Sequence, residues 1–427
     1  MYFVDSPEYN LRLRTPFRPP KTTLKEIHDA VPKHLLRPNP TRATLYVVRD
    51  ITLASFLFKA ASSIAYWESI DYYGLVTSSR VKLTLRVSLW MSYWILQGLV
   101  FAGIFCLGHD AGHGSLYKHK PLNNLVGFLL HTFLLIPYFS WRATHHAHHK
   151  ATASMERDEN YVPYTRSKYN LPDEQTVKKF DYSEAFEETP LATVYRLFIQ
   201  QFFGWWIYLS INLMGGVSHP PGTNHFNPNS TLFKPHHRKP SSPISKSALT
   251  SSPPGNSIII SDISLALMLC ILYQVGWDFV SKFYLIPYFF LNHWIVMFTF
   301  LHHSDPTIPH YRKNAWTFLR GAAATVDRPL LGWAGRFFFH NISHDHVAHH
   351  FFLSAPFFNG PQITKVLKLV LSEDYNYDPT PSFYALWRSF TKCIFVEEDG
   401  DIIFYKDKNG KAARQLAEDA FVDKLED

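Results

Sequence analysis

Uncharged apolar runs separated by polar segments dominate the pattern of this chain. Residues 87–107 form the longest run, and about 20 apolar residues in a helix cross a hydrocarbon core roughly 30 Å thick. Further runs lie at residues 51–67, 122–139, 197–214, 258–277 and 283–301. Two of these runs hold one charged residue each, Lys59 in the first and Asp262 in 258–277. One such run could equally be a buried helix of a soluble core, but several in one chain indicate a helical membrane protein.

The charge of one loop predicts how these runs are arranged. Residues 215–256 are rich in Pro, Ser and Asn and hold no acidic residue, and their Lys and Arg residues are Lys234, Arg238, Lys239 and Lys246. Cytosolic loops are enriched in Lys and Arg, so we expect this loop on the cytosolic side. The two runs that follow it, 258–277 and 283–301, then form one membrane hairpin.

The remaining runs complete the expected topology. Residues 51–67 pair with 87–107 as a second hairpin, which predicts an all-α, multi-span fold with about four spans. Residues 122–139 are short and broken by Pro137. We therefore expect them, like residues 197–214, to lie in the membrane interface or to re-enter the membrane.

The composition divides the chain into three regions. Residues 1–50 are Pro-rich and lack the basic-then-apolar pattern of a signal peptide, which predicts a cytosolic N-terminal segment. Residues 51–371 hold the membrane domain. Residues 372–427 are polar and predict a small soluble cap, in which 393–405 form a hairpin around an Asp-Gly pair and a charged helix ends the chain.

Charge and cysteine content narrow the class of partner. The net charge of +7 comes from basic residues scattered among apolar runs, which favours an anionic membrane surface over nucleic acid. Cys106, Cys270 and Cys393 are far apart in the sequence and predict neither a disulfide framework nor a zinc ribbon. The 23 histidines, in contrast, gather in short runs, and clustered imidazole is typical of metal binding.

Three histidine clusters stand out. His109 and His113 are four residues apart, and therefore share one face of a helix that continues out of the run 87–107. Two further clusters have the pattern His-x-x-His-His, in which one helical turn separates the first imidazole from the next pair. They comprise His145, His148 and His149, and His346, His349 and His350.

Eight imidazoles exceed the four ligands that one zinc ion takes, and they predict two transition-metal ions. Iron is the reasonable choice where dioxygen is activated. Carboxylate-bridged di-iron bundles need Glu-x-x-His, which does not occur here. A membrane metal transporter is the alternative of another class, but its ligands should line the spans, whereas these clusters follow span ends.

The similarity to a known family extends beyond the clusters. It covers Thr-Leu-Lys-Glu-Ile-His-Asp-Ala-Val-Pro at 23–32, Pro-Tyr-Phe-Ser-Trp-Arg at 137–142, Glu-Arg-Asp-Glu-Asn-Tyr-Val-Pro at 156–163, Gly-Ala-Ala-Ala-Thr-Val-Asp-Arg at 321–328 and Phe-His-Asn-Ile at 339–342. At these residues the chain resembles the membrane fatty acid desaturases, specifically the methyl-end acyl desaturases of fungi and plants.

This resemblance implies roles for individual residues. The eight cluster histidines would bind two irons, and a ninth ligand would come from the end of the last span, where we favour His303 over His302. His146, His340 and His344 would have supporting or structural roles. Asp110 and Asp345, beside the clusters, could orient ligand imidazoles, with simple solvated charge as the alternative.

The resemblance also implies the reaction and its partners. We expect an O2-dependent desaturase that places a cis bond on the methyl side of a Δ9 bond, converting oleoyl to linoleoyl. Asp110 and Ala111 stand where oleate desaturases usually carry Glu and Cys, so an omega-3 (Δ15) desaturase, an acetylenase and a hydroxylase stay open. The segment from His219 to Gly222 resembles a cytochrome b5 haem loop, but without a domain around it we expect a turn.

Electrons would then come from a separate cytochrome b5 and its reductase. The substrate would be an acyl lipid or an acyl-CoA in a bilayer. We expect the protein in the endoplasmic reticulum, with its histidine clusters facing the cytosol.

Overall fold

The computed structural model describes residues 3–64, 66, 78–173, 185–186, 188–233 and 255–420. Helices dominate these residues. The long ones are α3 (Pro40–Ser62), α5 (Ser79–His113), α9 (Pro190–Ile211), α11 (Gly255–Val275) and α13 (Ile286–His303). The fold is helical, as the apolar runs predict.

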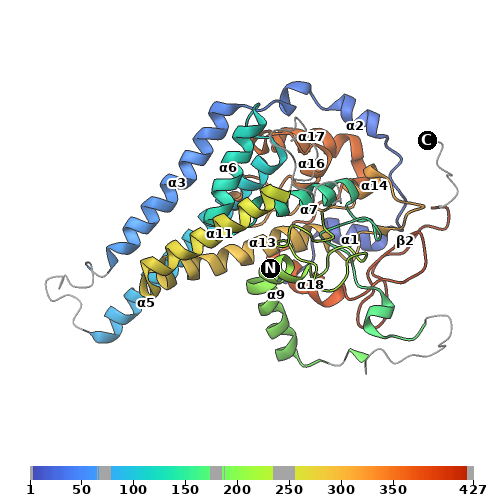
Figure 1. Ribbon diagram of the computed structural model, residues 1–427. Helices are drawn as coiled ribbons and strands as arrows, with labels where there is room; N and C mark the ends of the chain where they lie inside the picture. Colours follow the sequence, from blue (N-terminus) through green and yellow to red (C-terminus); the bar gives the residue numbers. More distant parts are fainter. Residues whose placement is uncertain are drawn as a thin grey trace.

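Short helices make up much of the rest. They are α1 (Pro7–Arg14), α2 (Leu24–Ala30), α6 (Lys120–Phe133), α7 (Tyr138–Ala151), α12 (Trp277–Val280), α14 (Phe318–Ala323), α15 (Trp333–Phe338), α16 (His346–Phe351), α17 (Gly360–Leu371) and α18 (Ser382–Lys392). Single turns are the 3-10 helices η1 (Lys33–Leu36), η2 (Arg166–Tyr169), η4 (Phe357–Asn359) and η5 (Ser372–Asp374) and the π-helix η3 (Ser281–Leu285). In Figure 1 the long helices α3, α5, α11 and α13 extend together to the lower left, and the C-terminus lies at the opposite end.

Three described segments are long and apolar enough to cross a membrane. They are Ser79–His113, Asn256–Val275 and Trp277–His303, and the bent pair α6 and α7 makes a fourth if it counts as one segment. The predicted run 87–107 lies within the first of these. Residues 51–62 of the predicted run 51–67 form the second half of α3, which is not among the candidates in the described residues, so four spans in two hairpins remain a prediction.

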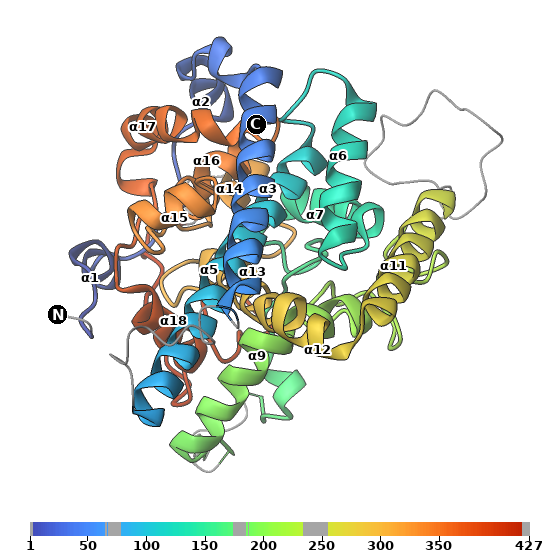
Figure 2. The same cartoon turned by 90° about the vertical axis from the view of Figure 1, so that its left-hand side faces the viewer.

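The chain turns at one glycine between α11 and α12. Gly276 has a φ of 95°, which L-residues with a side chain rarely adopt, and the helix resumes at Trp277. The sequence patterns placed this turn later, between 277 and 283, and that position is wrong because α12 and η3 keep the intervening residues helical. Figure 2 shows α11 on one flank of the molecule, and only 17 % of its apolar window is buried, against 72 % for α5.

The break expected at Pro137 is present. Helices α6 and α7 meet at an angle of 110°, and Leu135 in the connection has a φ of 52°. Pro137 stands directly before α7, where its fixed φ and missing N–H suit a helix start. The bend turns α7 back toward the end of α5.

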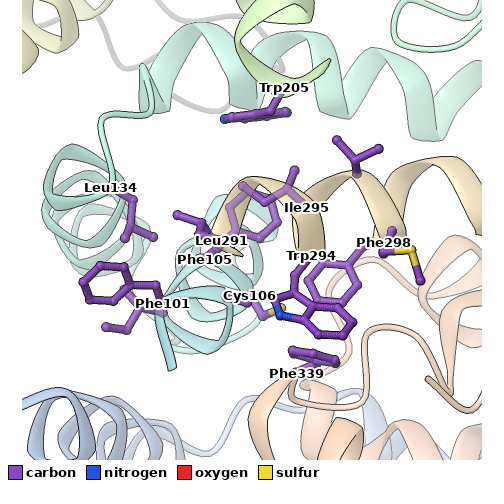
Figure 3. Close-up of a cluster of buried hydrophobic side chains, with 14 of the residues drawn as sticks. Phe101, Phe105, Cys106, Leu134, Trp205, Leu291, Trp294, Ile295, Phe298 and Phe339 are labelled. Atoms are coloured by element: carbon purple, nitrogen blue, oxygen red, sulfur yellow. The ribbon is translucent and has the colours of Figure 1, made fainter. Parts of the chain in front are cut away.

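Helices α5 and α13 form the centre of the core. A Cβ added to Gly98 would lie 2.3 Å from the Cβ of Phe290, so only glycine permits this close approach. Figure 3 shows Phe105 and Cys106 from α5 beside Leu291, Trp294 and Phe298 from α13. All three cysteines are free, as their spacing predicts.

The C-terminal residues include the segment in which the sequence predicts a hairpin. Lys406 pairs with Phe395 across a turn at Gly400, which has a φ of 99°, and this agrees with the expected hairpin. In addition, β2 (Ile402–Ile403) pairs antiparallel with β1 (His310–Tyr311).

The charged final helix is absent from residues 406–420, and within this described part the prediction is wrong. The N–H of Phe17 donates to the carbonyl of Gln415 at 2.8 Å, and the N–H of Ala417 donates to the carbonyl of Phe17 at 3.0 Å. This parallel bridge holds the C-terminal backbone extended. Residues 234–254, which carry the four basic residues of the predicted cytosolic loop, lie outside the described residues.

Candidate metal centre

Four helix ends bring nine of the predicted histidines together. His109 and His113 lie in the last turns of α5, and His303 ends α13. The second cluster lies in α7 and the third forms α16. Because i, i+3 and i+4 positions of a helix share a face, each cluster presents its imidazoles to the same centre.

One group of five imidazoles surrounds a first point. Its ligand atoms lie within 4.8 Å of one another, and its members are His109, His113, His145, His149 and His349. Among them, His149 Nε2 lies 3.0 Å from His145 Nε2 and 3.1 Å from His349 Nε2.

A second group lies beside the first and is more buried. His148, His303 and His350 meet the same 4.8 Å criterion. His346 belongs with them, because its Nε2 lies 3.1 Å from the Nε2 atoms of both His303 and His350. Nine imidazoles therefore divide into two neighbouring groups of five and four.

Three cluster imidazoles form a hydrogen bond through Nδ1, the nitrogen that faces away from the centre of their group. These bonds determine which nitrogen of each ring carries the proton. His109 Nδ1 lies 2.8 Å from Asp110 Oδ1, and His148 Nδ1 lies 2.7 Å from Asp158 Oδ1. His346 Nδ1 lies 3.3 Å from the carbonyl of Ile342. Carboxylates and carbonyls only accept, so Nδ1 is the protonated nitrogen and each Nε2 presents a lone pair to the centre.

Loss of hydration keeps the rings of the third cluster neutral. It lowers the pKa of His349 to about 3, with His109 adding to the shift, and it lowers the pKa values of His346 and His350 well below the usual 6.5. Neighbouring histidines act in the same direction, because adjacent rings cannot all carry charge. Neutral imidazole is the form that binds a transition metal.

The donor set fits metal ions. Nε2 atoms of the cluster histidines lie 3.0–3.3 Å apart, and those of His109 and His346 present lone pairs because their Nδ1 atoms face acceptors. A cation between them satisfies these lone pairs, and the separation into two groups provides for two ions. The number and type of donors match an all-nitrogen transition-metal site better than one tetrahedral zinc.

The four other histidines that the sequence analysis weighed as ligands or supports lie outside the two groups. His302 donates from Nδ1 to the carbonyl of Val326 at 2.5 Å, and His146 Nε2 lies 2.9 Å from the carbonyl of Gly112. His340 pairs with Asp50 at 2.6 Å, and His344 packs beside Gly335.

The two carboxylates singled out from the sequence differ in placement. Asp110 contacts a cluster imidazole directly, through His109 Nδ1. The Asp345 carboxylate instead pairs with Arg336 at 3.0 Å and, among the described residues, makes no hydrogen bond to a cluster imidazole.

Sequence reasoning missed Asp158. It contacts His148 and is 2 % exposed, and its Oδ1 also accepts the backbone N–H of Asn160 at 3.0 Å. The sequence signal for this contact was the position of Asp158 in the Glu-Arg-Asp segment shortly after the second cluster. That segment folds directly back on α7, which carries His148. His219, by contrast, lies in a turn with Gly222 at a φ of 87°, as predicted.

Residues 326–328 join the elements that carry the second group. Val326 contacts His302 through both backbone groups, and Asp327 Oδ1 accepts the N–H of Val347 at 2.7 Å, next to His346. Arg328 Nη2 donates to Asp305 Oδ2 at 2.6 Å, two residues after His303. This 326–328 segment therefore fixes the end of α13 relative to the start of α16.

An apolar cavity lies against both histidine groups. His109 and His145 of the first group and His148, His303 and His346 of the second border it. Aromatic and aliphatic side chains form most of its remaining wall, including Phe105, Trp141, Trp205, Val296, Phe298 and Phe300. A hydrocarbon chain in this cavity would lie beside both groups of nitrogens.

Comparison with known proteins identifies the family of this chain. The family model for fatty acid desaturases covers residues 88–381. The chain belongs to the fatty acid desaturase family. This desaturase is 41 % identical to a Delta(12) fatty acid desaturase of Mortierella isabellina over 399 residues, which cover 91 % of each chain. The identity to a Mortierella alpina Delta(12) fatty acid desaturase is 40 % over the same share of each chain.

Related chemistry occurs among the similar proteins. An oleate hydroxylase of Claviceps purpurea is 33 % identical and aligns over 94 % of this desaturase and 84 % of its own length. Membership of this family makes the protein an oxidoreductase, which agrees with the expected enzyme class and sets aside the transporter alternative.

Proposed function

We propose that this desaturase introduces a cis double bond on the methyl side of an existing Δ9 bond, converting an oleoyl chain to a linoleoyl chain. The observation that carries the proposal is the apolar cavity that touches both histidine groups in a chain of this family. The Δ12 position rests on 41 % and 40 % identity to two proteins named Delta(12) fatty acid desaturases.

Nine histidines would hold two irons. The first would be bound within the group of five, and the second by His148, His303, His346 and His350. A bound iron pair supplies the oxidant for an unactivated C–H bond, for which no side chain offers equivalent chemistry. In the net reaction the substrate loses two hydrogens, and dioxygen becomes two waters with two further protons and two electrons from an external carrier.

The chain's own residues supply orientation and exclusion of water. Asp110 and Asp158 keep the protons of His109 and His148 on Nδ1, so that Nε2 stays available to metal. Trp141 stacks on His145 with ring centroids 4.8 Å apart and also lines the cavity. The apolar walls would hold the methylene groups of the substrate beside the two histidine groups and exclude water from that space.

The same proposal covers the membrane setting. Four spans in two hairpins would place all three clusters on the cytosolic face of the endoplasmic reticulum. A separate cytochrome b5 with its reductase would deliver the electrons. The apolar exposed surface of α11 supports contact with lipid.

Hydroxylation at the same carbon is the second candidate function. It is favoured by the 33 % identity to an oleate hydroxylase across most of this chain. Desaturation and hydroxylation both begin with removal of a hydrogen from one methylene. In desaturation a second hydrogen is then lost from the neighbouring carbon, whereas in hydroxylation the first carbon gains a hydroxyl group.

Expression in a yeast that makes only oleate and palmitoleate tests the proposal. Gas chromatography of derivatised methyl esters should show new Δ9,Δ12 dienes. A hydroxylated oleate would support the second candidate. No product from oleate, with a triene or acetylenic acid when linoleate is fed, would contradict the Δ12 assignment.

A further inference from the structure

A second, smaller cavity also touches the first histidine group. His349 and Asp110 border it, whereas His109 and His145 border the apolar cavity. Ile342 lines both cavities and forms a wall that they share. The first group is therefore bordered by two spaces, of which the apolar cavity is one.

The wall of the smaller cavity combines polar and apolar side chains. It is formed by the end of α5, the connection from α15 to α16, and the segment from α16 to α17, and Figure 2 shows α15, α16 and α17 together on one side of the molecule. The polar residues are Asp110, His340, Asn341, Asp345 and His349. The space open to water measures about 30 Å³, and one water needs roughly 10–15 Å³ on this measure, so about two waters fit.

Two buried polar atoms of residues that line the smaller cavity have no partner. Asp345 Oδ1 and His340 Nδ1 make no hydrogen bond within the part of the chain that the structure describes. The other oxygen of Asp345 accepts from Arg336 at 3.0 Å. His340 Nε2 lies 2.6 Å from Asp50 Oδ2, and since a carboxylate only accepts, Nε2 carries the proton and Nδ1 presents a lone pair. Both unpaired atoms are thus acceptors that lack a donor.

Water supplies the donors that these two atoms lack. A buried acceptor without a donor costs free energy, and one water molecule donates two hydrogen bonds. Buried waters are found where polar atoms have no other partner and the space is large enough. The volume of the smaller cavity and the two unpaired acceptors therefore indicate ordered water.

The outer end of the smaller cavity adjoins an exposed side chain. Arg336, whose side chain is 41 % exposed, donates to Asn341 Oδ1 and to Asp345 Oδ2, both at 3.0 Å. Asn341 and Asp345 both line the cavity. This end of the cavity is therefore one side chain away from solvent.

The inner end lies at the first histidine group. His349 is one of the five imidazoles of this group and lines the smaller cavity directly. Asp110 also lines it, and its Oδ1 accepts from His109 Nδ1 at 2.8 Å. Water in the cavity would connect the surface at Arg336 to the residues around the first metal.

The proposed reaction needs a polar route of this kind. In the net reaction dioxygen takes up two protons in addition to the two hydrogens of the substrate, and two waters are released. An acyl chain would fill the apolar cavity, whose aromatic and aliphatic walls offer few hydrogen bonds to a proton or a water. The smaller cavity provides hydrogen-bond acceptors and reaches the same histidine group.

We propose that the smaller cavity holds about two ordered waters, bound by Asp345 Oδ1 and His340 Nδ1. These waters form the route by which protons reach the first metal and by which product water leaves it. The route rests on the proposed function, whereas the water site itself requires no metal.

The water site is tested on the metal-free full chain. A crystallographic or cryo-electron microscopy map that resolves ordered water should show density within hydrogen-bonding distance of Asp345 Oδ1 and His340 Nδ1. Ala355→Leu adds apolar volume at the cavity wall and should remove this density. Ser354→Leu, at the exposed neighbouring residue outside the cavity, is the matched control and should keep it. An empty cavity in the wild type overturns the site.

The route is tested on the iron-loaded full chain with an oleoyl substrate. Ala355→Leu should lower kcat several-fold and raise the solvent deuterium isotope effect on kcat, because proton delivery becomes slower, while KM for the substrate stays unchanged. A change in packing alone would not raise the isotope effect, and Ser354→Leu should match the wild type. Loss of the waters in Ala355→Leu with an unchanged kcat and isotope effect overturns the route.

The outcomes separate this inference from the function on which it rests. A wild type that desaturates no oleoyl substrate contradicts the proposed function and with it the route, and the map of the metal-free chain still decides whether the water site exists. If Ala355→Leu does not accumulate in the membrane fraction, Ala355→Val takes its place, because it adds less volume at the same position.

Discussion

Arg328 Nε donates to the carbonyl oxygen of Leu301 at 2.8 Å, two residues before His303. The same guanidinium binds Asp305 on the far side of His303 and also Asp378, and Arg328 is 1 % exposed. One buried side chain thus holds the backbone on both sides of a proposed metal ligand. The position of His303 depends on this contact as much as on its own helix.

Replacing Arg328 should weaken the second metal site selectively. Arg328→Lys keeps the charge but loses the fork that reaches Leu301, Asp305 and Asp378 together. We expect the second metal to bind on the order of ten times more weakly, because supporting contacts of ligands typically contribute that much. Titration of the metal-free protein with iron measures it. Arg312→Lys, at a partly buried arginine that pairs with Glu156, should bind both metals normally, and an equal loss in both variants would contradict a specific role.

Ligand loss should differ between neighbouring histidines. His349→Ala removes a nitrogen of the first group and should abolish product while the protein stays in the membrane, because apolar packing holds the fold. His146→Ala should retain activity, since His146 bonds to the carbonyl of Gly112 instead. Fatty acid analysis with an immunoblot of the membrane fraction checks both. Complete loss in both variants would show that the ligands of the second cluster are wrongly assigned.

Asp158 should matter although it binds no metal. Asp158→Asn keeps the shape of the side chain but lets it donate to His148 Nδ1, which favours the wrong tautomer. We expect metal affinity to fall by about 10- to 100-fold, as is typical for partners of ligand histidines. Iron content after dialysis against a weak chelator measures the loss. The matched control is Glu156→Gln, whose side chain pairs with Arg312; similar losses would argue against the tautomer effect.

Stability of the metal-free protein should depend on pH through His349. Folding lowers its pKa from 6.5 to about 3, mainly by loss of hydration. The unfolded chain binds a proton below pH 6.5 that the folded chain does not, so this stability is complete above 6.5 and is lost as the pH falls toward 3. His349→Gln should reduce the slope by up to about 1.4 kcal/mol per pH unit. Unfolding in detergent at pH 5–7.5 tests this, with exposed His119→Gln as control; an unchanged slope in His349→Gln would contradict it.

The sequence predicted the parts of the site that follow local periodicity. His109 with His113, and the two His-x-x-His-His clusters, needed only helical spacing to share a face. The three clusters can meet because each of them follows the end of an apolar run. The apolar runs indicated this arrangement from the sequence. His303 was named through family resemblance, and the structure places it beside His346.

The parts that sequence reasoning missed depend on tertiary contacts. Asp158 contacts His148 because the chain reverses after α7, and Arg328 reaches Leu301 across 27 positions. The predicted final helix is absent from residues 406–420 for the same reason, since pairing with Phe17 near the other end of the chain overrides local propensity. No single-segment pattern contains such partners.

Metal content tests the central claim most directly. The full chain, purified without added chelator and loaded anaerobically with ferrous iron, should hold two irons per chain. X-ray absorption should show nitrogen ligands around both, as the two groups of imidazoles require. One zinc per chain and no iron would contradict the account.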